Sequence, residues 1–145
     1  MCFHSKQSKD AQTLQNRYKA QLQQPELFVT GDFNGFSHPW CAIITNDKQE
    51  IMQMAQWGLL PDWAKDKALQ NSTLNAKLET IGEKPSFKNY QTQRCLIPAD
   101  GFYEWQWLDP TGKKKQKYLV RLPGDPLFSF AGLWNTLSIH PLLAS

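Results

Sequence analysis

"RCLIPADGFYEWQWL" (94–108) is the stretch of sequence that decides the fold. Its second half alternates aromatic and polar side chains, a pattern that predicts a β-strand. The next segment, "DPTGK" (109–113), carries the residue types of a tight turn. "KQKYLVRL" (115–122) then predicts a second strand and "LFSFAGLW" (127–134) a last one. This part of the chain is therefore predicted to be mostly antiparallel sheet.

The rest of the chain adds two more strands and a few short helices. "CAIIT" (41–45) and "EIMQMAQWG" (50–58) predict strands joined by the polar turn "NDKQ". Helical spacing of apolar residues predicts a helix over 8–23, with Ser8 as its N-cap and Pro25 after its end. Shorter helical segments are predicted at 61–70 and 86–93. We predict one domain over 1–145, of a strand-rich α+β class, with an antiparallel or mixed sheet curled into a barrel-like core.

The composition is that of an ordinary globular protein, with 41% hydrophobic and 20% charged residues and a net charge of +3. The three cysteines, at positions 2, 41 and 95, do not have the spacing of a disulfide framework. No apolar run is long enough for a signal peptide or a membrane span. We therefore expect a cytoplasmic protein that does not contact a membrane. The six tryptophans are unusual and suit stacking surfaces as well as a core.

Cys2 follows the initial methionine directly. Removal of Met1 would give Cys2 a free α-amine beside its thiol, and this 1,2-aminothiol reacts readily with aldehydes. The alternative interpretation is an ordinary frayed terminus without a chemical role.

Glu104 lies within the aromatic run "GFYEWQW". Strand alternation places Tyr103, Trp105 and Trp107 on one face, and Phe102, Glu104 and Gln106 on the other. Partial burial would raise the pKa of the Glu104 carboxyl and suit it to acid–base chemistry near neutral pH. The alternative is a carboxylate on the solvent face of an amphipathic strand.

"STLNAKLET" (72–80) places Asn75 and Lys77 on one face if the segment is extended, and such a pair suits phosphate and sugar oxygens. An exposed strand edge protected by a lysine is the alternative. Trp57 and Trp63 flank a bend in "QWGLLPDWA", where either could stack on bases or belong to the core.

Other site types fit less well. Cys2-x-His4 and His38-x-x-Cys41 supply four residues of zinc-ligand type, but their spacing matches no common zinc finger. A nucleophile elbow and a phosphate-binding loop are both absent from the sequence. We predict no metal and no cofactor.

Taken together, these segments make the chain similar to the SOS-response-associated peptidase (SRAP) family, also called abasic-site processing proteins. The resemblance rests on "MC" at the start, "NGFSHP" (34–39), "WGLLPDWA" (57–64), "NAKLET" (75–80), "SFK" (86–88), "RCLIPADGFYEW" (94–105) and "FAGLW" (130–134), in family order. Two positions depart from the family pattern. Lys77 stands where the family usually has arginine, and Phe3-His4 stands where many members have Gly-Arg.

The C-terminal part of the family domain is expected to be missing. Members usually continue beyond "AGLW" to a block of the form H-x-R-M-P, whose histidine is catalytic. "SIHPLLAS" (138–145) offers His140 without the Arg-Met-Pro that should follow, so the catalytic role is not transferred to it.

The resemblance implies a sensor that cross-links covalently to abasic sites in single-stranded DNA during the response to DNA damage, with an associated peptidase or self-processing activity and a nucleoid-associated location. The implied catalytic residues are Cys2, Asn75 and Glu104. The implied DNA contacts are Lys77, Trp63, Pro39, His4, Lys84 and Lys88. A cysteine-dependent peptidase acting on proteins, and a non-catalytic module that binds single-stranded or modified DNA, remain as alternatives.

Overall fold

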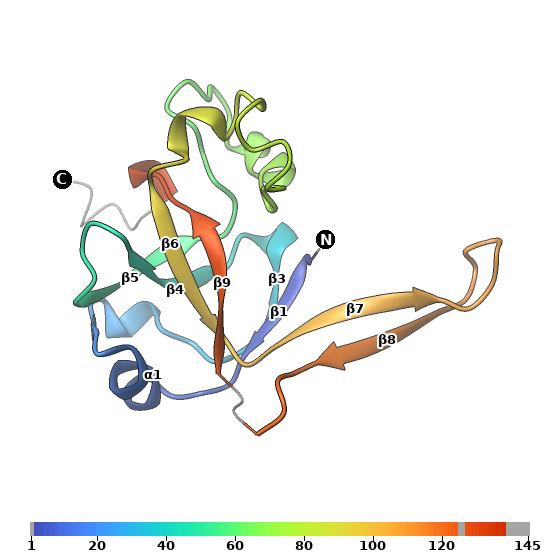
Figure 1. Cartoon of the computed structure of the whole chain (residues 1–145), viewed down its shortest axis with the longest axis horizontal. Coiled ribbons are helices and arrows are strands. Elements are labelled where there is room, and N and C mark those ends of the chain that lie inside the picture. The colour runs from blue at the N-terminus through green and yellow to red at the C-terminus, as the bar shows by residue number, and fades with distance from the viewer. Residues whose placement is uncertain (1, 125–126, 139–145) are drawn as a thin grey trace.

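Nine strands form two sheets in the computed structural model, which describes residues 2–124 and 127–138 (Figure 1). One sheet has the order β3-β1-β7-β8, from Gly31–Asn34, His4–Gln7, Gly101–Trp107 and Lys115–Val120. The other has the order β2-β5-β4-β6-β9, from Gln21–Leu22, Ile51–Gln56, Trp40–Thr45, Arg94–Ala99 and Phe128–Leu133. All pairings are antiparallel except β2 with β5. The predicted strand-rich α+β class is confirmed, although the two sheets do not close into a barrel within the described residues.

One α-helix, α1 (Ala11–Tyr18), occurs in the described part of the chain. The predicted helix over 8–23 is too long, because Lys19 adopts a left-handed conformation (φ 53°) that ends the helix. Ser8 is not the cap; instead the Asp10 carboxylate accepts a hydrogen bond from Thr13 N (2.8 Å). Leu14 of α1 is fully buried, together with Met52 and other apolar side chains of the five-stranded sheet.

The predicted strand over 94–108 is two strands, which belong to different sheets and meet at Asp100. Asp100 is fully buried, and its carboxylate accepts hydrogen bonds from Ser8 N (2.9 Å) and Ser8 Oγ. Its own amide donates to Lys6 O (2.9 Å). The hydrogen bonds of Asp100 therefore connect the turn after β1 to the point where the chain passes from one sheet to the other. The alternation of side chains within 94–108 did not predict this division into two strands.

Other differences concern short elements. Strands β1, β2 and β3 were not predicted, because each has only two to four residues and short strands carry little periodic pattern. Residues 61–66 are not helical; a 3-10 helix begins at Lys67 and ends at Ser72. The other 3-10 segments are Pro25–Leu27, Gly35–Ser37, Lys88–Tyr90 and Thr136–Ser138.

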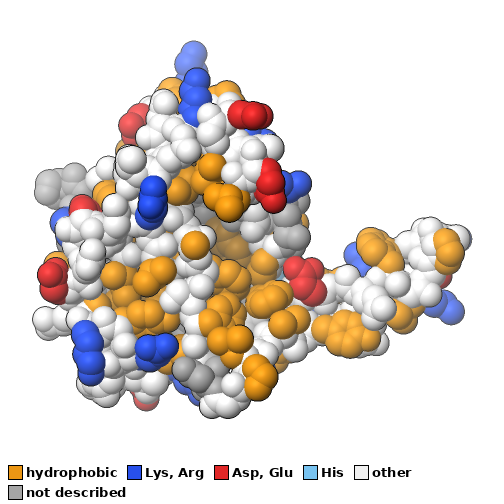
Figure 2. Space-filling model, viewed as in Figure 1, with side chains coloured by type: hydrophobic (Ala, Val, Ile, Leu, Met, Phe, Trp, Pro, Cys, Tyr) orange, Lys and Arg blue, Asp and Glu red, His pale blue; other side chains and the backbone are white. Residues whose placement is uncertain are grey.

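The hairpin of β7 and β8 extends away from the rest of the molecule (Figure 1). Strand β7 pairs with β1 only through Phe102 and Gly101, whereas its pairing with β8 runs from Phe102 to Trp107. In the described residues, the far part of β7 therefore has β8 as its only strand partner. Hydrophobic side chains gather over the body of the molecule, and both hydrophobic and lysine or arginine side chains occur on the hairpin (Figure 2).

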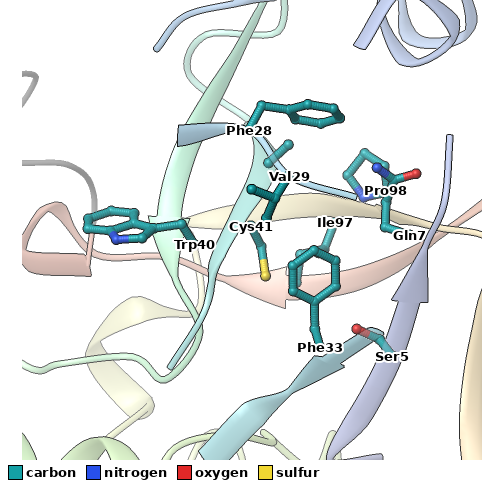
Figure 3. Close-up of a pocket in the computed structure, with 10 residues that line it drawn as sticks. Ser5, Gln7, Phe28, Val29, Phe33, Trp40, Cys41, Ile97 and Pro98 are labelled. Carbon is teal, nitrogen blue, oxygen red and sulfur yellow. The ribbon is translucent and has the colours of Figure 1, made fainter. Parts of the chain in front are cut away.

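A cavity of about 20 Å³ separates the two sheets, between Ser5 and Phe33 on one side and Cys41 and Ile97 on the other (Figure 3). Its size suits about one water molecule. Burial raises the pKa of the Cys41 thiol to about 12. The cavity is therefore a packing gap at the seam between the sheets and leaves no room for a substrate.

Candidate functional site

Cys2 lies two residues before the start of β1 at His4 and is half-buried. Its thiol donates a hydrogen bond to His4 O, with 3.1 Å between sulfur and oxygen. Burial raises the pKa of the Cys2 thiol above its ordinary value of 9.0, the hydrogen bond to His4 opposes this rise, and the negative charge of Glu104 adds to it. The thiol is therefore protonated at neutral pH.

Glu104 occupies the middle of β7 and is half-buried. Its effect on the pKa of Cys2 means that the carboxylate and the thiol are close enough to interact electrostatically, although 102 positions separate them in the chain (104 − 2). The pairing of Ser5 with Phe102 brings the start of β1 alongside β7 and explains this proximity. Two of the three predicted catalytic residues thus lie in one neighbourhood.

Asn75 follows the Lys67–Ser72 segment in irregular backbone, so the strand-edge interpretation of 72–80 is wrong. A series of contacts connects this segment to the N-terminal strand. Gly35 N donates to Phe3 O (2.8 Å), and Trp57 Nε1 donates to Leu74 O (2.8 Å). A Cβ atom on Gly35 would lie 3.2 Å from the Trp57 ring and 3.3 Å from Phe3 O, so a side chain at this position would press on both neighbours.

Two buried nitrogen atoms in this region have no hydrogen-bond partner among the described residues: Asn75 Nδ2 and His4 Nδ1. Buried polar atoms are normally paired, and unpaired ones call for an explanation such as a catalytic role or a ligand. Asn75 Nδ2 is a donor, and the His4 ring can donate or accept depending on its tautomer. The pair gives the neighbourhood of Cys2 unused capacity to hold the oxygen atoms of a bound molecule.

His4 begins β1 and packs edge-on against Trp105, with 4.9 Å between ring centroids. This contact places His4, one of the implied DNA contacts, next to the projecting hairpin.

The predicted phosphate-binding lysines, Lys77, Lys84 and Lys88, are all exposed and lie on one run of consecutive turns. Thr80 N donates to Lys77 O (3.1 Å), Lys84 N to Thr80 O (3.1 Å), and Lys88 N to Lys84 O (2.9 Å). The segment that carries Asn75 therefore continues into a compact loop, in which these three lysines outnumber Glu79 and Glu83 by one.

Trp63 is 51% exposed in a turn. The adjacent Asp62 N donates to Tyr90 Oη (2.8 Å), which anchors this turn to the body of the protein. Pro39 is half-buried, and its carbonyl accepts from Trp57 N (3.0 Å). Pro39 is thus held by Trp57, which also binds the residue before Asn75, whereas the turn of Trp63 is held by Tyr90. Trp63 has a free surface for a ligand.

An open hollow of about 460 Å³ lies beside this region, lined by residues that include Phe36, His38 and Asn71. The Phe36 ring packs on Phe3 at 5.1 Å between centroids, so the hollow adjoins the N-terminal strand. The His38 ring is fixed between Trp57 O (2.8 Å) and Asn71 Oδ1 (3.0 Å).

The zinc alternative receives no support from this geometry. His38 uses both ring nitrogens in the contacts just described. Among residues 2–124 and 127–138, no three His, Cys, Asp or Glu side chains are grouped so that they could hold a metal ion. His140 lies outside the described residues. Within the same ranges, none of the helices has the length and apolar character needed to cross a membrane.

Gly35 and the indole nitrogen of Trp57 were not predicted as part of the site. "NG" and "WG" in the quoted motifs were the available indications, but each is also a common turn pair. Their role becomes visible only when the distant segments 2–4, 34–39 and 72–76 are brought together.

The model of the SOS response associated peptidase (SRAP) family matches residues 1–141. The chain is similar to Abasic site processing protein YoqW of Bacillus subtilis (strain 168), with 45% identity over 104 residues, which are 69% of this chain and 46% of that protein. It is also similar to Abasic site processing protein HMCES of Pongo abelii, with 39% identity over 83 residues, 54% of this chain and 23% of that protein. The chain thus spans about half the length of YoqW, or 46%.

Solved structures share the fold. A crystal structure of a protein from Bacteroides thetaiotaomicron matches with a TM-score of 0.79 and 32% identity, over 92% of this chain and 61% of that one. One from Bordetella bronchiseptica matches with a TM-score of 0.73 at 24% identity, over 92% of this chain and 64% of that one. The predicted family resemblance is therefore confirmed over nearly the whole sequence.

Proposed function

Because this chain belongs to the SOS response associated peptidase family, we propose that it captures abasic sites in single-stranded DNA as a covalent cross-link through Cys2. The observation that carries the proposal is the pairing of β1 with β7, which brings the half-buried Cys2 alongside the part of β7 that holds Glu104. The names of the relatives, abasic site processing proteins, support the choice of substrate.

The chemistry begins with hydrolysis of the bond between Met1 and Cys2, by an aminopeptidase or by the chain itself. The freed α-amine has an ordinary pKa near 8, so a useful fraction is neutral at physiological pH. An abasic deoxyribose opens to an aldehyde at C1′, and the amine attacks this carbon to give a carbinolamine. Loss of water then gives an imine.

The Cys2 thiol completes the reaction. Its sulfur adds to the imine carbon, its proton passes to the imine nitrogen, and a five-membered thiazolidine ring closes. Amine, thiol and aldehyde are thereby converted to thiazolidine and one water molecule. Both groups sit on the same residue, so proximity favours closure. The product shields the lesion from strand cleavage.

The neighbours of Cys2 have separate roles. Glu104 protonates the leaving hydroxyl of the carbinolamine and then receives the proton released in imine formation. The unpaired Nδ2 of Asn75 donates to the sugar oxygens. Lys77, Lys84 and Lys88 attract the phosphates. His4 holds a phosphate or sugar oxygen through its free ring nitrogen.

Trp63 and Pro39 flank the lesion in this proposal. The exposed indole of Trp63 offers a stacking surface for one base next to the abasic nucleotide. Pro39 supports the strand on the other side. A complementary strand would collide with side chains placed between the bases in this way, so single-stranded DNA is the proposed partner.

The thiol of Cys2 is poorly suited to a peptidase that relies on a thiolate. Cysteine nucleophiles of that type have a lowered pKa, whereas burial and Glu104 raise that of Cys2. An aminothiol needs no thiolate for its first step, because the amine reacts first. The pKa direction therefore favours cross-linking over proteolysis of other proteins.

The test mixes the protein with abasic single-stranded DNA, intact single-stranded DNA and a peptide substrate, and follows each mixture by mass spectrometry. The expected result is an adduct with the abasic strand only, smaller than the sum of both masses by one water and lacking Met1. Cys2→Ala should form no stable adduct, but its α-amine should still be trapped by cyanoborohydride as a reduced imine.

Three results would count against the proposal. A stable Cys2→Ala adduct formed at the parent rate would show that the thiol is not required and that the adduct is not a thiazolidine at Cys2. Peptide cleavage that depends on Cys2, without any DNA adduct, would identify a peptidase instead. Binding of intact DNA without an adduct on the abasic strand would leave a binding module and overturn the covalent mechanism.

A further inference from the structure

The hairpin of β7 and β8 has two chemically different faces. Residues directly opposite one another in an antiparallel pair share a face. Trp105 pairs with Lys117, and Trp107 pairs with Lys115. Tyr103 lies on the same face by alternation. We call these five residues the aromatic–lysine face; Glu104 belongs to the opposite face, where it pairs with Tyr118.

Each ring on the aromatic–lysine face has a lysine over it. Lys117 Nζ lies 4.1 Å from the Tyr103 ring centroid and 5.6 Å from that of Trp105, and Lys115 Nζ lies 4.7 Å from that of Trp107. Trp105 is 37% exposed and Trp107 56%. Large aromatic side chains at such exposure, with cations rather than apolar groups as neighbours, are not serving as a core.

The charge of this region is mainly positive. Lys113 and Lys114 add to it in the turn at the end of the hairpin. The carboxylates nearby are already engaged. Asp32 accepts from Tyr103 Oη (2.8 Å), and Asp109 accepts from Thr111 Oγ1 and from the amides of Lys113 and Lys114. The exposed groups thus favour a polyanion.

The face is continuous with the proposed site. His4, two residues from Cys2, packs against Trp105 at 4.9 Å between centroids. From there Trp107 and Lys115 lead outward along the hairpin, away from the body of the protein (Figure 1). The contact between His4 and Trp105 thus brings the aromatic–lysine face next to a strand held at Cys2.

We propose that the aromatic–lysine face binds the single-stranded DNA flanking the lesion, with a base stacked on Trp107 and a phosphate held by Lys115. This rests on the proposed function, because it extends the same DNA path. Aromatic rings interleaved with lysines are the combination that holds single strands without sequence preference. On binding, the ammonium of Lys115 leaves the ring for a phosphate and the base takes its place, a favourable exchange because base stacking outweighs an exposed cation–π contact.

The experiment measures the dissociation constant for intact, fluorescently labelled single-stranded DNA by anisotropy. Intact DNA separates this proposal from the covalent chemistry. Trp107→Ala should weaken binding about tenfold, the value of roughly one stacked base. Trp107→Phe should retain most of the affinity. Trp107→Leu keeps an apolar side chain against Gly112, which lies beside the ring, but lacks a π face and should resemble Trp107→Ala.

Lysine variants test the phosphate contact. Lys115→Ala should reduce the slope of log K against log salt by about 0.7, as for one phosphate of a single strand. Lys48→Ala is the matched control: Lys48 is exposed in the turn between β4 and β5, on the other side of the molecule from the hairpin (Figure 1). It should leave both affinity and slope unchanged.

A second measurement uses abasic strands with flanks of about two or about ten nucleotides. The parent should cross-link faster with a long flank on one side of the lesion, and Trp107→Ala should lose this gain while retaining the short-flank rate. Unchanged intact-strand affinity in Trp107→Ala, Trp107→Leu and Lys115→Ala overturns the proposal and leaves the face as a protein-docking surface. If Trp107→Ala loses tenfold in affinity for intact DNA but neither the parent nor any variant forms an adduct with the abasic strand, the DNA contact of the hairpin is supported and the covalent mechanism is refuted.

Discussion

Replacing Trp57 with phenylalanine should loosen the connection between the segment that carries Asn75 and the N-terminal strand that carries Cys2. The indole nitrogen donates to Leu74 O (2.8 Å), immediately before Asn75, while the ring packs against Gly35, whose amide binds Phe3 O. Trp57→Phe retains an aromatic ring but removes the donor. The segment that carries Asn75 then loses its hydrogen bond to Trp57, through which it is connected to Gly35 and the N-terminal strand.

The magnitude follows from the burial of the acceptor. Leu74 is only 7% exposed, so an unpaired carbonyl there costs about 1–3 kcal/mol. The smaller ring leaves a cavity that adds about 1 kcal/mol. A total of about 2–4 kcal/mol in a domain of this size lowers the melting temperature by roughly 5–15 °C. A displacement of Asn75 by about 1 Å should also slow cross-linking by about 10- to 100-fold.

Thermal unfolding followed by near-UV circular dichroism, and a gel time course of adduct formation, measure these two effects. Trp134→Phe is the matched control, since it also removes an indole donor, here to Asn46 Oδ1 (3.2 Å), but away from Cys2 and Asn75. It should reduce stability less and leave the cross-linking rate unchanged. If Trp57→Phe and Trp134→Phe cross-link at the same rate, Trp57 does not position the site.

Three further predictions concern charge. The rate of Cys2 alkylation by iodoacetamide, read by peptide mass spectrometry, should rise about tenfold per pH unit between pH 7 and 9, because the raised pKa keeps Cys2 a thiol in this range. Glu104→Gln removes the negative charge that raises this pKa, so the variant should be alkylated faster at each pH. Slower alkylation of the variant would contradict the proximity of Glu104 to Cys2. Asp100→Asn should reduce the free energy of unfolding, measured in urea, by about 2–3 kcal/mol, because it removes the buried carboxylate that accepts charge-assisted hydrogen bonds from Ser8. Asp109→Asn is the control: Asp109 lies in an exposed turn, so this variant should lose less stability. Replacing the three lysines of the turn segment 77–88 with alanine should reduce the slope of log K against log salt by about 2 for single-stranded DNA, and an unchanged slope would place the phosphates elsewhere.

The longer strands could be predicted from sequence because each carries its own pattern. The alternation in "GFYEWQW" and the turn residues of "DPTGK" define the β7–β8 hairpin locally. The division of 94–108 at Asp100 could not be predicted in the same way. It depends on Ser8, 92 positions away (100 − 8), which pairs with the Asp100 carboxylate only in the folded chain.

In the candidate site, too, individual residues could be predicted from local sequence, but their arrangement depends on contacts between distant segments. Cys2 was notable for its chemistry alone, and Glu104 for its position in an aromatic strand. Their proximity depends on β1, a strand of four residues with too little pattern to be predicted. The expectation that 72–80 is extended was wrong because its backbone is set by contacts such as that from Trp57 to Leu74, rather than by a neighbouring strand.

The position of Glu104 also orders the steps of the proposed reaction. A carboxylate beside a thiol disfavours the thiolate, which carries the same charge, but it stabilises the protonated imine, which carries the opposite one. Glu104 therefore makes Cys2 a weak nucleophile before the aldehyde arrives and assists formation of the intermediate that the thiol must attack. Once the protonated imine has passed its proton to Glu104, sulfur bonds to the imine carbon and the thiol proton passes to the imine nitrogen. Attack by the amine first, and by the thiol second, is the sequence that this charge arrangement favours.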